Sequence, residues 1–213
     1  MEWLLQVPVL FFSVIFHEFA HGYAAHRRGD DTAYLSGRLT FNPLPHIDPV
    51  GSLLVPALSK IMGLPMIGWA KPVPVNPYRM HNPRTDMAVV ALSGPLSNVA
   101  LIVAAALAYK VLTLGLIKGD FVYTLLEMFR YAIFINLALA VFNLIPVFPL
   151  DGSQIALGLL KGRVLEVYEK HLPYGFYIIL GLVVTGIFKY VLMFPLWITA
   201  LLLYHGMGIY ILG

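Results

Sequence analysis

Residues 3–21 read WLLQVPVLFFSVIFHEFAH, an apolar run without a charged side chain until it ends in the pattern H-E-x-x-H. On a helix, His17 and His21 lie one turn apart on one face, the spacing at which two imidazoles bind one zinc ion. Glu18 occupies the next position, from which it can act as a general base toward an activated water. Because ionisable groups are costly in an apolar segment, this cluster predicts a zinc hydrolase whose active site lies in a membrane.

The composition of the chain agrees with a membrane location. Hydrophobic residues make up 59% of the 213 residues and charged residues 12%, whereas a soluble domain carries about 25% charged residues. The mean hydropathy is +0.79. Cysteine is absent, so disulfides and thiolate metal ligands are excluded. The start, Met1-Glu2, lacks the basic region of a secretory signal, so we expect the first apolar segment to remain as a transmembrane helix.

Six apolar segments predict an all-α polytopic membrane protein, a bundle of about five to six transmembrane segments with small extended (β-like) segments. They cover roughly residues 3–26, 50–64, 87–117, 121–150, 174–190 and 191–212. The second is too short to cross a core of about 30 Å, which predicts a re-entrant or interfacial helix. The last two flank Lys189 and are compatible with one broken hairpin.

We expect residues 1–213 to form a single integral-membrane domain. Its catalytic core would come from 1–26 and 87–152, with C-terminal helices in 173–213.

The distribution of basic residues predicts an orientation, because cytoplasmic loops are enriched in Lys and Arg. If nine basic residues in three groups along the chain share the cytoplasmic side, Lys110, Lys118 and Lys189 fall at or near the opposite face of the membrane. The first helix must start outside, and 50–64 must not cross. This topology explains the pI of about 9.1 without a nucleic-acid partner, and it directs the active site toward the cytoplasmic side. Nine basic residues share that side: Arg27, Arg28, Arg38, Lys71, Arg79, Arg84, Lys161, Arg163 and Lys170.

A catalytic zinc usually has three protein ligands, and Asp151 is the best candidate for the third. It closes the stretch AVFNLIPVFPLDG, residues 140–152, where an apolar segment breaks at Pro146 and Pro149 and turns at Gly152. By the charge argument this segment ends on the same side as the helix of His17. An ordinary turn aspartate beside a glycine is the plain alternative. The other candidates are Asp48, Glu127, His26, His46, His81, His171 and His205.

The chain resembles the site-2 protease family of intramembrane zinc metalloproteases. Residues 17–22, HEFAHG, resemble the first motif of that family, and 143–152, NLIPVFPLDG, resemble the second. Residues 93–98, SGPLSN, resemble a further signature. The segments 42–49 and 68–77 are similar to the short bacterial and archaeal branch without a PDZ domain. Phe148 departs from the pattern, since many relatives have a second proline there.

The resemblance implies one zinc ion bound by His17, His21 and Asp151, with Glu18 as the catalytic acid and base. It implies that Asn143 positions substrate or stabilises an oxyanion, while a buried asparagine that bridges unwound backbone is the structural alternative. The substrates would be transmembrane proteins in the lipid bilayer of a prokaryotic cell, cut within or near their transmembrane helices. A homo-oligomer or an adaptor protein stays open.

Three alternatives remain open on the sequence alone. The extended segment 68–77 can pair with an unwound substrate as an added strand, or it can be a surface loop. Ser93-Gly94-Pro95 would let helices approach closely and introduce a kink, so its role can be in packing or in catalysis. A non-proteolytic membrane protein that binds or transports a metal would use the same three ligands, but it would give Glu18 no necessary role.

Overall fold

The computed structural model describes residues 3–55, 58, 61, 70–115, 119 and 121–209. Every regular element in these residues is helical, so the predicted all-α class is confirmed, whereas no extended segment forms a strand there. The longer helices are α1 (Trp3–Arg27), α4 (Pro83–Thr113), α5 (Phe121–Leu144), α6 (Asp151–Leu159), α7 (Gly162–His171), α8 (Gly175–Val184) and α9 (Ile187–Met207). The short ones are α2 (Thr32–Leu35), η1 (Leu44–His46), the π-helix η2 (Pro49–Leu54), η3 (Pro77–Arg79) and η4 (Leu172–Tyr174).

Four helices in the described part of the chain are long and apolar enough to cross a membrane: Leu5–Arg27, Pro83–Thr113, Phe121–Leu144 and Lys189–Met207. They lie within α1, α4, α5 and α9. Of the short segment 50–64, the structure describes the π-helix up to Leu54 and little beyond it. Its predicted re-entrant or interfacial course therefore lies largely outside the described residues.

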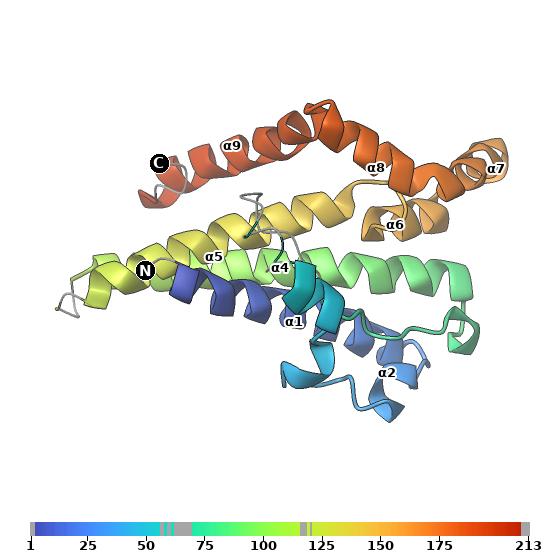
Figure 1. The fold of residues 1–213 in the computed structure, drawn as a ribbon, viewed down its shortest axis with the longest axis horizontal. Helices are drawn as coiled ribbons and strands as arrows, with labels where there is room; N and C mark the ends of the chain where they lie inside the picture. Colours follow the sequence, from blue (N-terminus) through green and yellow to red (C-terminus); the bar gives the residue numbers. More distant parts are fainter. Residues whose placement is uncertain are drawn as a thin grey trace.

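Helices α1, α4 and α5 run side by side along the long axis of the molecule (Figure 1). Helix α4 runs opposite to both α1 and α5, so the end of α1, the start of α4 and the end of α5 meet at one end of the bundle (Figure 1). Helix α6 packs there against α4 and α5. Arg84 secures this packing, since its guanidinium donates to the Leu157 carbonyl at 2.7 Å and also to the Leu160 carbonyl.

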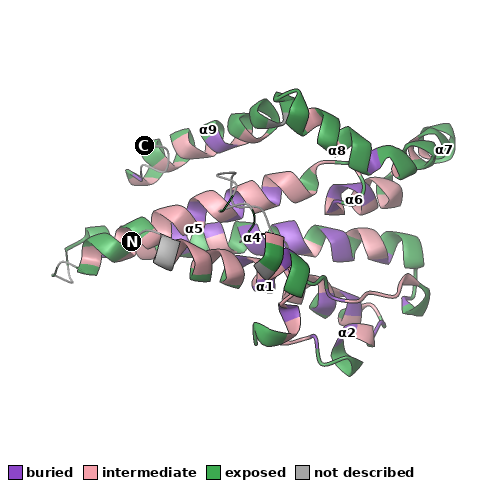
Figure 2. Ribbon diagram, viewed as in Figure 1, coloured by how far each residue is buried: buried purple, intermediate pink, exposed green. Residues whose placement is uncertain are grey.

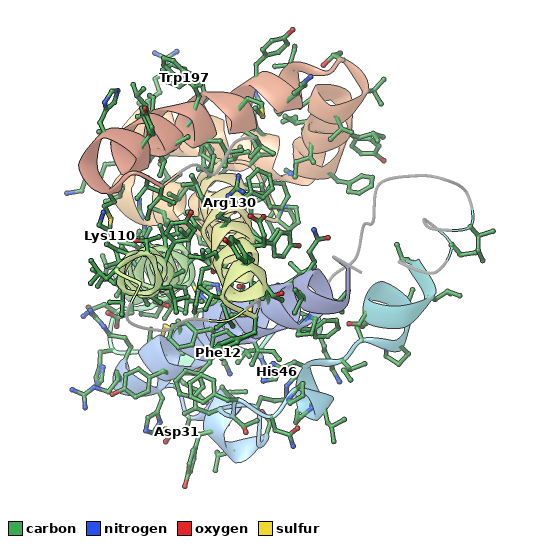
Figure 3. The ribbon with its side chains drawn as sticks, turned by 90° about the vertical axis from the view of Figure 1, so that its left-hand side faces the viewer. Phe12, Asp31, His46, Lys110, Arg130 and Trp197 are labelled. Carbon is green, nitrogen blue, oxygen red and sulfur yellow. The ribbon has the colours of Figure 1, made fainter. Side chains whose placement is uncertain are left out.

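The apolar core lies between α4, α5 and α9, around Ile102, Ile133, Leu137 and Leu196. Buried residues follow the inner faces of the helices, whereas α7, α8 and much of α9 are exposed (Figure 2). Many of these exposed side chains are large and apolar. Trp197, for example, is 58% exposed and lies on the outer side of α9 (Figure 3). Such a surface is expected where lipid rather than water surrounds a helix.

The C-terminal helices differ from the hairpin that Lys189 suggested. Helix α8 ends at Val184, and α9 begins at Ile187 and contains Lys189. Gly186 between them has φ of +74°, in the left-handed region. The chain bends there but continues along the same general direction instead of folding back (Figure 1).

Candidate metal centre

The structure brings His17 and His21 of α1 together with Asp151, the first residue of α6. The two Nε2 atoms lie 3.0 Å apart. Asp151 Oδ2 lies 3.2 Å from the Nε2 of His17 and 3.3 Å from that of His21. In the part of the chain that the structure describes, this trio is the group of His, Cys, Asp and Glu side chains whose ligand atoms all lie within 4.8 Å of one another.

The three atoms fit a zinc ion. Tetrahedral zinc with bonds of about 2.0–2.1 Å separates its ligand atoms by about 3.3–3.4 Å, close to the spacings found. Asp151 Oδ2 is buried without a hydrogen-bond partner. Two imidazole lone pairs and a carboxylate oxygen at these distances repel one another unless a cation lies between them. The donor set therefore suits a bound divalent metal.

Helix α4 orients both imidazoles through their Nδ1 atoms. His21 Nδ1 lies 2.8 Å from the carbonyl of Val90 and donates to it, because a carbonyl can only accept. His17 Nδ1 lies 2.7 Å from Asn98 Oδ1. Each Nε2 is thus left to face Asp151.

Gly94 of α4 lies directly against the histidine pair. A Cβ at this position would come within 2.5 Å of His21 Nε2 and 2.6 Å of His17 Cε1, so only glycine allows this approach. Pro95 follows inside the helix. The expected close approach at Ser93-Gly94-Pro95 is therefore present, and the partner of Gly94 is the metal centre itself.

The loop after α5 presents Asp151. Helix α5 ends at Leu144, ahead of Pro146, as the breaking of the apolar segment predicted. The turn closes earlier than expected, however, since α6 already begins at Asp151 and contains Gly152. A Cβ on Gly152 would meet the Ile145 carbonyl oxygen at 2.5 Å, so the first turn of α6 packs closely on the end of α5.

Glu18, next to His17 on α1, is hydrogen-bonded to the segment before α4. Its Oε2 accepts a hydrogen bond from the Val73 backbone N–H at 2.7 Å. Arg38, itself buried, donates to the carbonyls of Lys71 and Pro72 and holds the segment in place. Residues 70–76 are neither helix nor strand. Because these contacts use backbone groups that an added substrate strand would need, they favour the loop alternative for this part of 68–77.

Asn143 is not joined to the trio by a hydrogen bond; its amide donates to the Leu139 carbonyl of its own helix at 3.1 Å. Its assignment to substrate or oxyanion stays a prediction.

Other candidate ligands have separate structural partners. Asp48 caps η2, where Oδ1 accepts from the N–H groups of Val50 and Gly51. His26 pairs with Asp31 at 2.5 Å. The ring of His46 contacts the Thr40 carbonyl, in the segment that lies beside α1 in Figure 3. Glu127 pairs with Arg130, and His171 contacts the Val167 carbonyl.

Sequence reasoning noted 93–98 as a signature but assigned no role to Asn98, and it missed Asn136 and Ser13, the other two polar side chains behind His17. The three side chains form a buried chain of hydrogen bonds. A signal was present, because Ser13 lies one helical turn before His17 on the same face. Asn98 and Asn136 are polar positions within apolar segments, where such residues are costly.

Comparisons with known proteins agree with this site. Residues 6–184 match the model of peptidase family M50. The chain is 38% identical over 191 residues to YwhC of Bacillus subtilis, which is named as a zinc metalloprotease. That match covers 87% of this chain and 83% of YwhC.

A second relative is Rip2 of Mycolicibacterium smegmatis, also named as a zinc metalloprotease, at 28% identity over 185 residues. That match covers 85% of this chain and 67% of the relative. Rip2 of Mycobacterium tuberculosis is 32% identical over 142 residues, 66% of this chain and 51% of the relative. No solved structure matches. The chain therefore belongs to peptidase family M50, the site-2 protease family, and is an integral-membrane zinc metalloprotease.

Proposed function

We propose that this metalloprotease cuts other membrane proteins within or near their transmembrane helices, with His17, His21 and Asp151 holding one zinc ion. The observation that carries the assignment is the spacing of 3.0–3.3 Å among the three ligand atoms. Membership of family M50 favours proteolysis over metal storage or transport, and it gives Glu18 the role that those alternatives lack.

The chemistry divides between the metal and the chain. Zinc bound by this trio supplies a Lewis acid that activates water and polarises a carbonyl. Glu18 takes a proton from the attacking water and returns it to the leaving amine. The Val73 N–H fixes one oxygen of this carboxylate. Asn143 would leave the Leu139 carbonyl and donate to the oxyanion, a contact worth about 3–4 kcal/mol in other enzymes.

A transmembrane helix hides its peptide bonds in its own hydrogen bonds, so the substrate must unwind locally before it is cut. The catalytic core would combine 1–26 with 87–152, in agreement with the packing of α1, α4, α5 and α6. Of the helices within 173–213, α9 packs against α5 of this core, and α8 packs against α9.

We further propose that the centre faces the cytoplasmic side of a prokaryotic cell membrane. Arg27 at the end of α1, Arg84 at the start of α4 and Arg163 in α7 gather at one end of the bundle (Figure 1). Lys110 lies near the far end of α4. By the positive-inside rule the first end is cytoplasmic. Four of the expected five to six transmembrane segments are supported by the candidate spans in the described residues. Segment 50–64 stays in the proposal as a re-entrant or interfacial helix.

The decisive experiment compares wild type with Glu18→Gln, purified in detergent, for bound zinc and for cleavage of a model transmembrane substrate. Both proteins should hold one zinc ion, and only wild type should cleave. Glu127→Gln is the matched control, since this residue lies on α5 in an exposed pair with Arg130, and it should cleave like wild type. Undiminished cleavage by Glu18→Gln would overturn the assignment of the base.

A further inference from the structure

A chain of four hydrogen bonds leads from the metal centre into the bundle and links α1, α4 and α5. His17 Nδ1 and Asn98 Oδ1 lie 2.7 Å apart. Asn98 Nδ2 donates to Asn136 Oδ1 at 2.8 Å. Asn136 Nδ2 donates to Ser13 Oγ at 2.9 Å, and Ser13 Oγ donates to the Val9 carbonyl at 2.8 Å. Ser13, Asn98 and Asn136 are each at most 1% exposed.

The Ala132 carbonyl determines which atom of each asparagine donates and which accepts along this series of hydrogen bonds. Asn136 Nδ2 also lies 2.8 Å from the Ala132 carbonyl, and a carbonyl can only accept. The amide nitrogen of Asn136 must therefore face Ala132 and Ser13, which leaves its oxygen to face Asn98. Asn98 must then donate with its own nitrogen and present its oxygen to His17.

The last link fixes the histidine. Because Asn98 Oδ1 can only accept, His17 must carry its proton on Nδ1, and the neutral ring then has a bare lone pair on Nε2. That nitrogen is the one 3.2 Å from Asp151. The same tautomer of His21 is fixed by a single hydrogen bond, which its Nδ1 donates to the Val90 carbonyl. Metal-binding histidines are commonly oriented by such a partner on the other ring nitrogen.

We propose that Ser13, Asn136 and Asn98 form a relay that fixes the tautomer and the orientation of His17, which makes both asparagines positioning residues of the metal centre. The inference rests on the proposed role of His17 as a zinc ligand. It adds to that role a second set of residues, none of which touches the metal site except through His17.

Packing alone does not explain these side chains. Three buried polar groups in apolar helices cost free energy unless all their hydrogen bonds are made. A cavity of about 510 Å³ lies beside Ser13 and Asn136 and is otherwise lined by apolar side chains such as Phe12, Met128 and Phe129. Apolar residues of similar size would therefore fit at this place without a polar network.

The test measures the metal site directly in the full-length protein in detergent. Zinc affinity is determined by competition with a chelator for wild type, Asn98→Leu and Asn136→Leu. The tautomer of His17 is read from the ¹⁵N signals of the imidazoles in zinc-free protein. Loss of an orienting partner typically lowers metal affinity about 10–100-fold. We expect a fall of this size in the zinc affinity of Asn98→Leu and Asn136→Leu, together with a mixture of His17 tautomers.

Two controls separate the relay from general destabilisation. Ser97→Ala changes a buried neighbour of Asn98 that donates only to the Gly94 carbonyl of its own helix, and its zinc affinity should equal that of wild type. Ser13→Ala removes one end of the relay with little change in volume and should lower zinc affinity by less than the leucine variants, because the Ala132 carbonyl still accepts from the Asn136 amide. Ser13→Thr keeps the hydroxyl and should not lower it. This pair decides the question if the leucine variants fail to fold.

His17→Ala distinguishes failure of the relay from failure of the ligand assignment. If His17→Ala binds zinc as tightly as wild type, the proposed metal site is wrong. If His17→Ala loses zinc while Ser13→Ala and both leucine variants keep wild-type affinity and an unchanged His17 tautomer, the ligand assignment stands and the relay is overturned.

Discussion

His17 Nε2 lies 3.2 Å from Asp151 Oδ2, although 134 positions of sequence separate the two residues. Two packing contacts make this approach possible. Gly94 lets α4 lie against the histidines, and Gly152 lets the start of α6 pack on the end of α5. The candidate metal centre therefore depends on how four helices, α1, α4, α5 and α6, pack together.

Gly94→Ala should abolish zinc binding and cleavage. The added methyl group would lie within 2.5 Å of His21 Nε2 and 2.6 Å of His17 Cε1, so the imidazoles or the helix must shift. Zinc content of the purified variant is the measurement.

Gly181→Ala is the matched control, since a Cβ on that glycine of α8 meets no atom within 4 Å. In a helix interior this change favours folding by about 1 kcal/mol. Full zinc occupancy in Gly94→Ala would show that the close approach is not required.

Zinc should stabilise the folded protein through Asp151. A ligand at 100 times its dissociation constant adds about 2.7 kcal/mol to the free energy of unfolding. Adding zinc should raise the thermal midpoint of the wild type, and a chelator should lower it. Asp151→Ala should show neither shift, whereas Asp31→Ala, which alters an exposed pair with His26, should behave as wild type. Equal zinc responses in both variants would contradict the assigned carboxylate ligand.

Val73→Pro should lower kcat with little change in KM. The substitution removes the N–H that holds Glu18 Oε2 at 2.7 Å, and a net hydrogen bond to a charged group is worth about 1.5–3 kcal/mol. We therefore expect a loss of roughly 10–100-fold in cleavage rate, with zinc content unchanged. Val73→Ala keeps the N–H and is the control. Equal losses in both variants would point to side-chain packing against Gly22 instead.

Membrane orientation can be tested with single cysteines, because the chain contains none. Lys161→Cys, at the N-cap of α7, should react with an impermeant thiol reagent only from the cytoplasmic face. Tyr123→Cys, 76% exposed near the start of α5, should react only from the opposite face. Labelling of both from one face would reject the antiparallel course across the membrane, and the reversed pattern would reject the proposed orientation.

Much of the fold was predictable because its signals are local. Long apolar runs predicted helices that overlap α1, α4 and α5, with ends shifted by up to six residues, and Pro146 marked the end of α5. The break between α8 and α9 was misplaced at Lys189 because that side chain is compatible with a helix interior, whereas the chain bends at Gly186. The expected strands depended on backbone pairing, and residues 70–76 instead bond to side chains of Arg38 and Glu18.

The sequence by itself determined the chemistry of the site. The spacing of His17 and His21 puts two proposed zinc ligands on one helical face, Glu18 follows between them, and Asp151 stands where an apolar segment breaks. The tertiary structure alone decided how these groups are held. Gly94 makes room for the histidines, Val73 holds Glu18, and Asn136 orients His17 through Asn98. The physical reason is that helix periodicity is a local property, whereas contacts between helices depend on the packing of the whole bundle.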